Sequence, residues 1–321
     1  MGRCGSVQEK CGVNRSAWGL VCLVILLVCS GGLVTAYRAG MAIPDWPTTF
    51  GHWIYLPHHW RGRFDGVFLN QLHRTLAQLT LAWSVVVAVV TWRVGAGRQV
   101  RMLGLAIVFG LVVQGAVGGW RVLSESVPVA RVHGAMAPLV LGLCMALAVV
   151  TSQRWRAAQP ARRHPYGKAL RRWCLATLVL AYLLIVANVQ MRHVPPTAGL
   201  AWLPFWGWSK LLLAAITAVV AGRLLVLARR RFRDCPAILR RTGWFAGLLA
   251  VQLLLGGGVW IANYGWPPWF ADYVLPIRYT ITAEGVLRTA ATTAHVVMGA
   301  VVTAVGANAA LWAYRESQGP R

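Results

Sequence analysis

The chain has 321 residues, of which 57% are hydrophobic and only 12% are charged. Its mean hydropathy is +0.56. The apolar surface of such a chain is larger than one water-soluble core can bury. This composition excludes an ordinary soluble globular protein and indicates a membrane protein. The formal net charge of +24 raises nucleic-acid binding as an alternative, which only the positions of the basic residues can test.

Eight apolar stretches are each long enough to cross about 30 Å of hydrocarbon at 1.5 Å of helical rise per residue. In chain order, they predict helices over residues 17–36, 69–92, 102–120, 130–151, 172–190, 205–228, 243–262 and 287–312. The first stretch follows a basic flank and lacks a small-residue cleavage site, so we predict a retained helix rather than a signal peptide. The predicted fold class is an all-α polytopic membrane protein with eight transmembrane helices.

An internal repeat divides these helices into two sets of four. Three pairs of segments recur at matching places in the two halves: 39–47 with 198–205, 113–120 with 251–258, and 133–137 with 295–300. Because each copy is about half of the chain, we predict two pseudo-symmetric four-helix bundles. The predicted organisation is a first bundle over 1–152 with a long outer loop at 37–68, a basic cytoplasmic linker at 153–172, and a second bundle over 173–321.

The basic residues are concentrated in the connections that follow even-numbered helices. Seven Lys and Arg residues lie between the fourth and fifth helices and seven more between Arg223 and Arg241, whereas the loops 37–68 and 263–286 hold four together. This asymmetry predicts a multi-pass protein of a bacterial-type inner (cytoplasmic) membrane, with both termini in the cytoplasm. The basic face would then lie against anionic lipid headgroups, so we expect membrane lipid, and not nucleic acid, as a partner.

Three histidines enter the predicted helices near the outer face: His73, His133 and His295. An ionisable group at such depth is costly unless it has a partner. If antiparallel helices bring His73 and His133 to one depth, two neutral imidazoles could form an axial pair for a heme iron. An interhelical hydrogen bond is the alternative for each histidine.

Small and basic residues accompany these histidines. Gly115, Gly118 and Gly119 would leave room for a flat macrocycle between helices, although glycine in membrane helices also serves close packing. Arg74 and Arg121 are candidates to hold propionates at the outer rim. A further residue, His193, ends the fifth helix, and we predict a solvated interfacial histidine there.

The sequence resembles the heme A synthase family over nearly the whole chain, more strongly in the first half. The resemblance rests on Arg38–Gly51, Leu72-His73-Arg74, Gly118–Arg121 and Val132-His133-Gly134. It implies an oxidoreductase that converts heme O to heme A by oxidising the C8 methyl group, for cytochrome oxidase biogenesis. His73 and His133 would be axial ligands of the substrate heme, while the second bundle would house heme b near His295. Heme O synthase and cytochrome oxidase assembly proteins are the partners it implies.

The chain departs from the family's pattern at three places. Asn70 stands where the family commonly has a glutamate, Ser209-Lys210 stands where the second bundle would open with His-Arg, and residues 37–68 contain no cysteine pair. An amide cannot act as a general base, so proton transfer would need another group. A second hypothesis therefore stays open: a diverged bis-histidine heme b protein for binding or electron transfer, without oxygenase activity.

Overall fold

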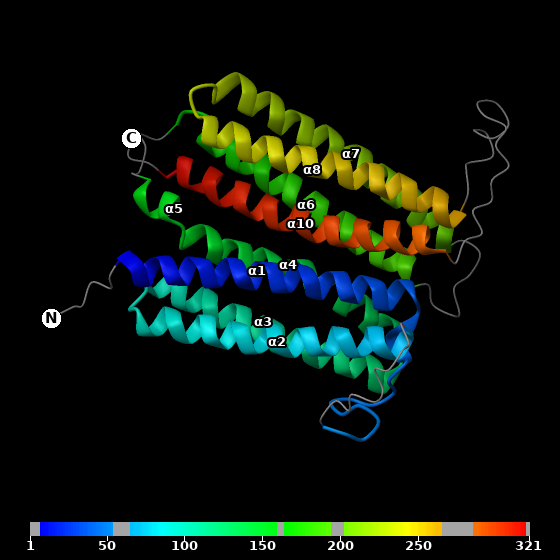
Figure 1. Cartoon of the computed structure of the whole chain (residues 1–321). Coiled ribbons are helices and arrows are strands. Elements are labelled where there is room, and N and C mark those ends of the chain that lie inside the picture. The colour runs from blue at the N-terminus through cyan, green and yellow to red at the C-terminus, as the bar shows by residue number, and fades with distance from the viewer. Residues whose placement is uncertain (1–6, 54–64, 159–163, 194–201, 265–284, 319–321) are drawn as a thin grey trace, which may run out of the picture.

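The computed structural model describes residues 7–53, 65–158, 164–193, 202–264 and 285–318, in which all the regular elements are helices (Figure 1). In chain order they are α1 (Val7–Ala36), η1 (Ala39–Met41), α2 (Gly66–Arg93), α3 (Arg98–Ser124), α4 (Val127–Val150), α5 (Gln153–Ala157), α6 (Gly167–Arg192), α7 (Trp202–Arg231), α8 (Pro236–Tyr264) and α10 (Val286–Glu316).

Eight of the described helices are long and apolar enough to span a membrane, which confirms the predicted number and fold class. Most of them run beyond the predicted ends, as in α8, which begins at Pro236 and includes Arg240 and Arg241. The exceptions are the last residues of α1, which ends at Ala36 as predicted, and of α4, which ends at Val150. The apolar stretch marks only the hydrocarbon-embedded part of a helix, whereas long basic side chains let the same helix continue into the headgroup region. The five-residue α5, within the expected linker, was not predicted from the sequence.

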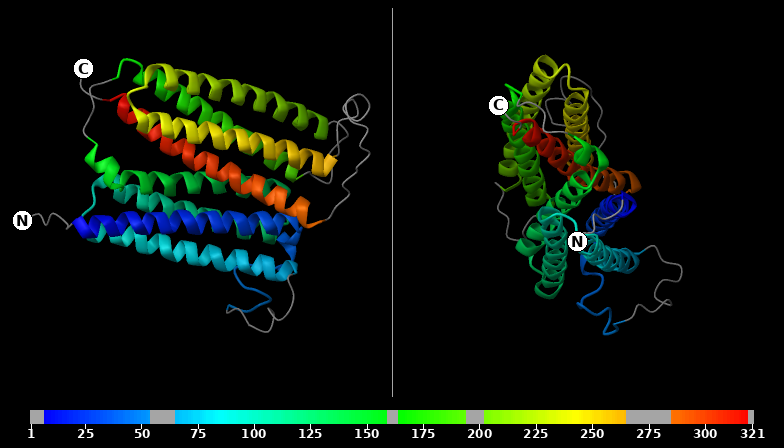
Figure 2. Two further views of the ribbon diagram at one scale, coloured as in Figure 1. Left: turned by 45° about the horizontal axis from the view of Figure 1, so that its top comes forward. Right: turned by 90° about the vertical axis from the view of Figure 1, so that its left-hand side faces the viewer.

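The long helices pack as two rings of four (Figure 2). In the first ring, α1 contacts α2, α2 contacts α3, α3 contacts α4, and α4 closes against α1. The second ring follows the same order through α6, α7, α8 and α10. This packing is consistent with the two predicted bundles. Within the described residues, α2 and α4 make at most marginal contact, as do α7 and α10, so these pairs occupy opposite corners of their rings.

The two rings meet mainly through α10, which packs against α1 and α4 as well as against its own neighbours α6 and α8. Buried apolar side chains of α1, α4, α6, α8 and α10 form one continuous core across this interface. Tyr182 of α6 adds a polar contact by donating a hydrogen bond of 3.1 Å to the carbonyl of Ala135 in α4. The bundles therefore share a core.

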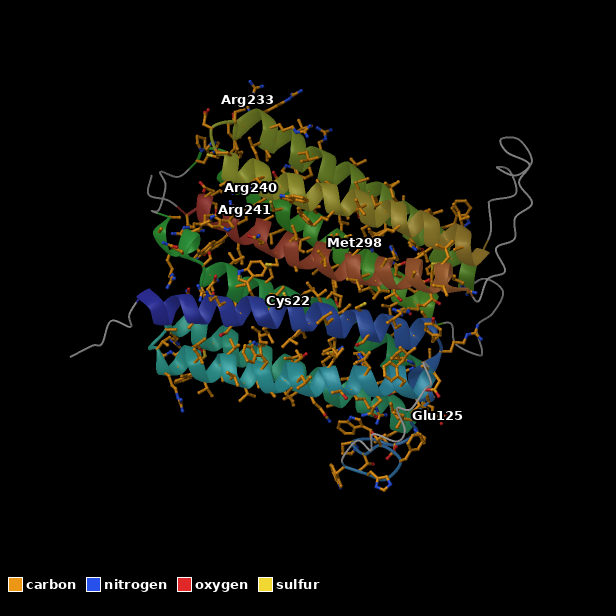
Figure 3. The ribbon with its side chains drawn as sticks, viewed as in Figure 1. Cys22, Glu125, Arg233, Arg240, Arg241 and Met298 are labelled. Carbon is orange, nitrogen blue, oxygen red and sulfur yellow. The ribbon has the colours of Figure 1, made fainter. Side chains whose placement is uncertain are left out.

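The first described residues of α1 and the last of α10 lie at one end of the helix array, which we call the terminal end; the opposite end, where α1 ends and α2 begins, is the loop end (Figure 1). Figure 3 shows Arg233, Arg240 and Arg241 at the terminal end and Glu125 at the loop end. This distribution agrees with the predicted charge asymmetry, and the assignment of the terminal end to the cytoplasm stays a prediction.

Arg315 ties the two halves together at the terminal end. Its Nη1 donates a hydrogen bond of 2.6 Å to the carbonyl of Trp155 in α5, and its Nη2 donates to the carbonyl of Ala158. The guanidinium also lies 4.7 Å from the Trp155 ring centroid, in cation–π range. The short α5 thus anchors the end of α10.

Gly306 provides a test of the α10 packing. A Cβ atom there would lie 2.8 Å from Leu178 Cδ1 and from ring atoms of the fully buried Phe245. We expect Gly306→Ala to lower the free energy of unfolding in mixed detergent micelles by about 1–3 kcal/mol, the usual cost of overpacking. Gly247→Ala is the matched control, because a Cβ atom at that exposed glycine meets nothing within 4 Å. Equal stability of the two variants would contradict the packing described here.

Candidate functional site

Each of the three candidate histidines faces a glycine on a neighbouring helix. An added Cβ atom would lie 2.9 Å from Cε1 of His73 if built on Gly31, 2.9 Å from Cε1 of His133 if built on Gly118, and 3.1 Å from Cε1 of His295 if built on Gly256. Each imidazole therefore fits against backbone where any side chain would displace it. The backbone carbonyl one turn before each glycine also acts electrostatically on the facing ring; these carbonyls belong to Leu27, Gln114 and Gln252.

His73 is oriented by Ser30 of α1. Ser30 Oγ donates a hydrogen bond of 2.9 Å to the carbonyl of Leu27 and lies 2.9 Å from His73 Nδ1. Because the hydroxyl proton is used by the carbonyl, the hydrogen bond between the two side chains takes its proton from Nδ1. This assignment leaves the lone pair of the neutral imidazole on Nε2, the tautomer that a metal ligand requires.

His133 lies on α4, at the corner of the first ring opposite the α2 corner that carries His73. The two imidazoles are within electrostatic range of each other. His133 Nδ1 is buried and has no hydrogen-bond partner in the described part of the chain. Gln114 steadies the helix beside it by donating a hydrogen bond of 2.9 Å from Nε2 to the His133 carbonyl.

Burial distinguishes the two bundles. The side chains of His73 and His133 are half-buried although both contact neighbouring helices inside the first ring, whereas His295 has only 7% of its surface exposed. The side chain of His295 therefore has the smallest exposed fraction of the three histidines.

In the second bundle, His295 pairs with an amide. Asn188 of α6 lies 3.1 Å from His295 Nε2, with its Nδ2 as the atom nearest the ring nitrogen. The opposite corner of this ring is α7, where Ser209 and the half-buried Lys210 lie and where the Lys210 charge acts on His295. A bis-histidine heme needs two free imidazole nitrogens that face each other, so the described residues here do not match such a site.

Asn70 has a structural role that the sequence did not reveal. Its buried side chain donates hydrogen bonds from Nδ2 to the carbonyls of Ala39, at 2.8 Å, and Gly40, at 3.2 Å. Its Oδ1 accepts a hydrogen bond of 3.0 Å from Arg74 Nε. The amide thus joins the start of the outer loop to α2, one turn from His73. An ionised glutamate at this position has no proton to donate to the two carbonyls.

The two arginines predicted to hold propionates both contact the outer loop. Arg74 donates hydrogen bonds to the carbonyls of Thr48, at 2.9 Å, and Ile43, at 3.2 Å. Arg121 donates one of 3.4 Å to the carbonyl of Gly40, and an added Cβ atom at Gly40 would collide with its guanidinium. Arg74 is therefore engaged in loop anchoring, whereas the charge of Arg121 also acts on both His73 and His133.

The loop itself is shaped by Asp45. Its carboxylate accepts hydrogen bonds from the backbone nitrogens of Phe50, at 2.8 Å, and Gly51, at 2.9 Å, and from Thr48 Oγ1 at 2.5 Å. Burial acts to raise the pKa of Asp45, but these hydrogen bonds to the ionised form outweigh it and lower the pKa to about 2. Asp45 is therefore ionised at neutral pH and committed to the turn, which makes it a poor proton donor for the site.

His193 is more enclosed than predicted. Burial, followed by the charges of Arg192, Arg121 and Arg131, lowers the pKa of His193 to about 4, so its ring is neutral at physiological pH. Its carbonyl accepts two hydrogen bonds from Arg131 of α4, at 3.0 and 2.6 Å. The end of α6 is thus fastened to the first bundle, and Arg192 beside it was not among the predicted site residues.

The described side chains of the first bundle are compatible with a heme. The chain offers two opposed imidazoles with glycine against each ring edge, and one of them has its tautomer set by a serine. No cluster of three or more His, Cys, Asp or Glu side chains occurs among the residues described, but a porphyrin iron needs only two axial ligands from the protein.

Gly118 tests the fit of His133 against α3. We expect Gly118→Ala to displace the imidazole and lower heme affinity by about tenfold, as do other changes in groups that orient a metal ligand. The measurement is heme titration followed by Soret absorbance. Gly115→Ala, one turn earlier on the same helix, is the control because its Cβ atom would meet nothing within 4 Å. An unchanged affinity in both variants would show that Gly118 does not position the ring.

Asn70 tests the attachment of the loop. Both Asn70→Ala and Asn70→Glu lose the donor to two buried carbonyls, so we expect each to reduce stability by about 1–3 kcal/mol. Thermal unfolding in detergent measures this loss, and proteolysis within residues 37–53 reports loop release. Gln78→Ala is the control, since Gln78 is an exposed polar residue of the same helix. A fully stable Asn70→Glu variant would refute the structural role of the amide.

Comparison with known proteins shows the family of this chain. The family model for cytochrome oxidase assembly proteins, COX15-CtaA, matches residues 14–189, which is more than half of the chain. The matched region contains His73 and His133 and ends before Ser209 and His295. A search of curated proteins found no match. The chain therefore belongs to the COX15-CtaA family of cytochrome oxidase assembly proteins.

Proposed function

We propose that this protein is a membrane oxidoreductase of the heme A synthase type, which oxidises the C8 methyl group of heme O to the formyl group of heme A. Membership of a cytochrome oxidase assembly family supports the general role. The observation that carries the specific proposal is the opposition of His73 and His133, each against a glycine, at opposite corners of the first bundle. That arrangement would suit a heme held between the helices.

The protein's own contribution is binding, orientation and exclusion of water. Ser30 keeps the Nε2 lone pair of His73 available, and Gly31 and Gly118 fix the two ring edges. Asn70, Arg74 and Arg121 fasten the described part of the outer loop to α2 and α3 at the loop end of the first bundle. The conversion of a methyl to a formyl group removes four electrons, so an external oxidant of the dioxygen class would have to accept them. The iron of the bound heme would supply the redox chemistry, while the protein sets position and dielectric.

We further propose that the second bundle holds no bis-histidine heme b. His295 Nε2 is paired with Asn188, and Lys210 lies on the helix where the second ligand would be needed. A cation directed towards the site disfavours the positive charge of a ferric centre. In this proposal His295 serves as a hydrogen-bonding link between α6 and α10, and the chain carries one heme.

A second candidate function is a diverged heme b protein that transfers electrons without oxygenating its ligand. Asn70 favours this alternative, because the amide stands where the family commonly has a glutamate and is fully used in holding the loop. Six-coordinate iron with two strong axial ligands suits electron transfer, since no open position invites oxygen. The heme recovered from the purified protein separates the two candidates.

We also propose a location and partners for the protein. The eight spans and the basic terminal end support a multi-pass protein of the cytoplasmic membrane, with anionic lipid against that end. Heme O would be delivered by heme O synthase, and heme A would pass to cytochrome oxidase assembly proteins.

Heme extraction and a pyridine hemochrome spectrum, on protein from a host that makes heme O, test the reaction. We expect heme A in the wild type, whereas heme B or O without heme A would favour the electron carrier. His73→Ala and His133→Ala should each abolish heme retention, because one axial ligand is lost. His164→Ala should retain heme, since His164 stacks on Phe232 with 4.0 Å between ring centroids, and Phe232 directly follows α7 at the terminal end. Equal heme content in all variants would refute the bis-histidine site.

A further inference from the structure

The rings of His73 and His133 lie in matching positions against the neighbouring helix. A Cβ atom built on Gly31 of α1 would lie 2.9, 3.4 and 3.7 Å from Cε1, Nδ1 and Nε2 of His73. A Cβ atom built on Gly118 of α3 would lie 2.9, 3.2 and 3.7 Å from the same three atoms of His133. Because the two rings present the same edge to the same kind of backbone position, a difference between them as ligands must come from the other groups around them.

The residue before each glycine supplies such a difference. Ser30 precedes Gly31 on α1, whereas Val117 precedes Gly118 on α3. Ser30 Oγ lies 2.9 Å from Nδ1 of His73. A valine side chain has no atom that accepts a hydrogen bond, so the matching place on α3 offers no such partner.

The Ser30 hydroxyl connects the His73 ring to the backbone of α1 through two hydrogen bonds in series. It donates to the carbonyl of Leu27 at 2.9 Å, and it accepts from Nδ1 of the imidazole. Only 4% of the Ser30 surface is exposed, so solvent has little access to this hydroxyl. Linked hydrogen bonds polarise one another, so a hydroxyl that already donates its proton is a better acceptor. The Nδ1–H bond of His73 is therefore polarised towards Ser30.

This contact changes the ligand strength of His73. A histidine that donates a hydrogen bond from one ring nitrogen becomes a more basic ligand at the other. A more basic ligand stabilises ferric iron more than ferrous iron, because the ferric centre carries the larger positive charge. Nδ1 of His133, by contrast, has no hydrogen-bond partner in the part of the chain that the structure describes. The two opposed imidazoles are therefore unequal donors.

We propose that Ser30 is a positioning residue that makes His73 the stronger of the two axial ligands and so lowers the reduction potential of the bound heme. This inference rests on the proposed heme site of the first bundle. A lower potential makes ferrous iron the stronger reductant, which favours transfer of its electron to an acceptor in both candidate functions.

The experiment is a spectroelectrochemical titration of the full-length protein with its heme, in neutral detergent. We expect Ser30→Ala to retain heme and to raise the midpoint potential by about 59 mV, which is a tenfold change in the ferric-to-ferrous preference for one electron. Ser84→Ala is the control and should leave the potential unchanged. The Ser84 hydroxyl is also buried and donates to a carbonyl, that of Leu81 at 2.7 Å, but it lies about three turns from His73 on α2.

A reciprocal variant, Val117→Ser, places a hydroxyl at the matching position on α3. We expect it to lower the midpoint potential by a similar amount, because Nδ1 of His133 then gains the partner that His73 already has. A serine needed only for helix packing would not produce shifts of opposite sign in the two variants.

The proposal is overturned if Ser30→Ala retains heme at an unchanged potential, or if Ser84→Ala shifts the potential as much as Ser30→Ala does. An unchanged or raised potential in Val117→Ser would likewise overturn the inequality of the two ligands. If Ser30→Ala loses its heme, the direction of the Val117→Ser shift decides alone. A wild type that binds no heme refutes the heme site itself, which is a different outcome from a heme site whose potential ignores Ser30.

Discussion

The structure depends on one constraint: an imidazole placed inside a membrane bundle must have its ring position and its polar nitrogens defined by neighbouring helices. Water is not available there to solvate a misplaced ring, and an unsatisfied polar group in hydrocarbon is costly. The chain meets this constraint the same way three times, with a glycine against the Cε1 edge and a backbone carbonyl one turn earlier. That contact sets how closely the two helices approach, which rotamer the histidine adopts and in which direction its ring nitrogens point.

The outer loop and the proposed heme site are mechanically linked through α2. Asn70 and Arg74, which lie on either side of His73 along this helix, hold the loop by its backbone carbonyls. Trp46 of the loop also lies over Gly119 of α3, where an added Cβ atom would collide with the indole. The depth of His73 in the bundle is therefore coupled to the closure of the loop end.

Sequence patterns predicted the helices and their number, because long apolar stretches have few alternatives in a membrane protein. They also predicted His73 and His133 as a pair, since both begin helices that enter from the same side. Most helices extend beyond their predicted ends because charged residues continue them past the hydrocarbon, whereas α1 ends at Ala36 as predicted. Ser30 was not predicted because its role depends on a contact 43 residues away, which no local pattern encodes.

The two halves share one contact, a glycine against an imidazole edge, and differ in the partner of that imidazole. Gly256 still receives the edge of His295, and Gln252 still lies one turn earlier, as Gln114 does before Gly118. The difference lies on the helix at the opposite corner of each ring. In the first bundle this helix, α2, carries His73, whereas in the second bundle α7 carries Lys210. A buried imidazole without an opposing ligand must find another partner, and Asn188 on the adjacent helix supplies it. The second bundle thereby keeps the contact between a glycine and an imidazole edge that the first bundle has, without a second histidine at the opposite corner.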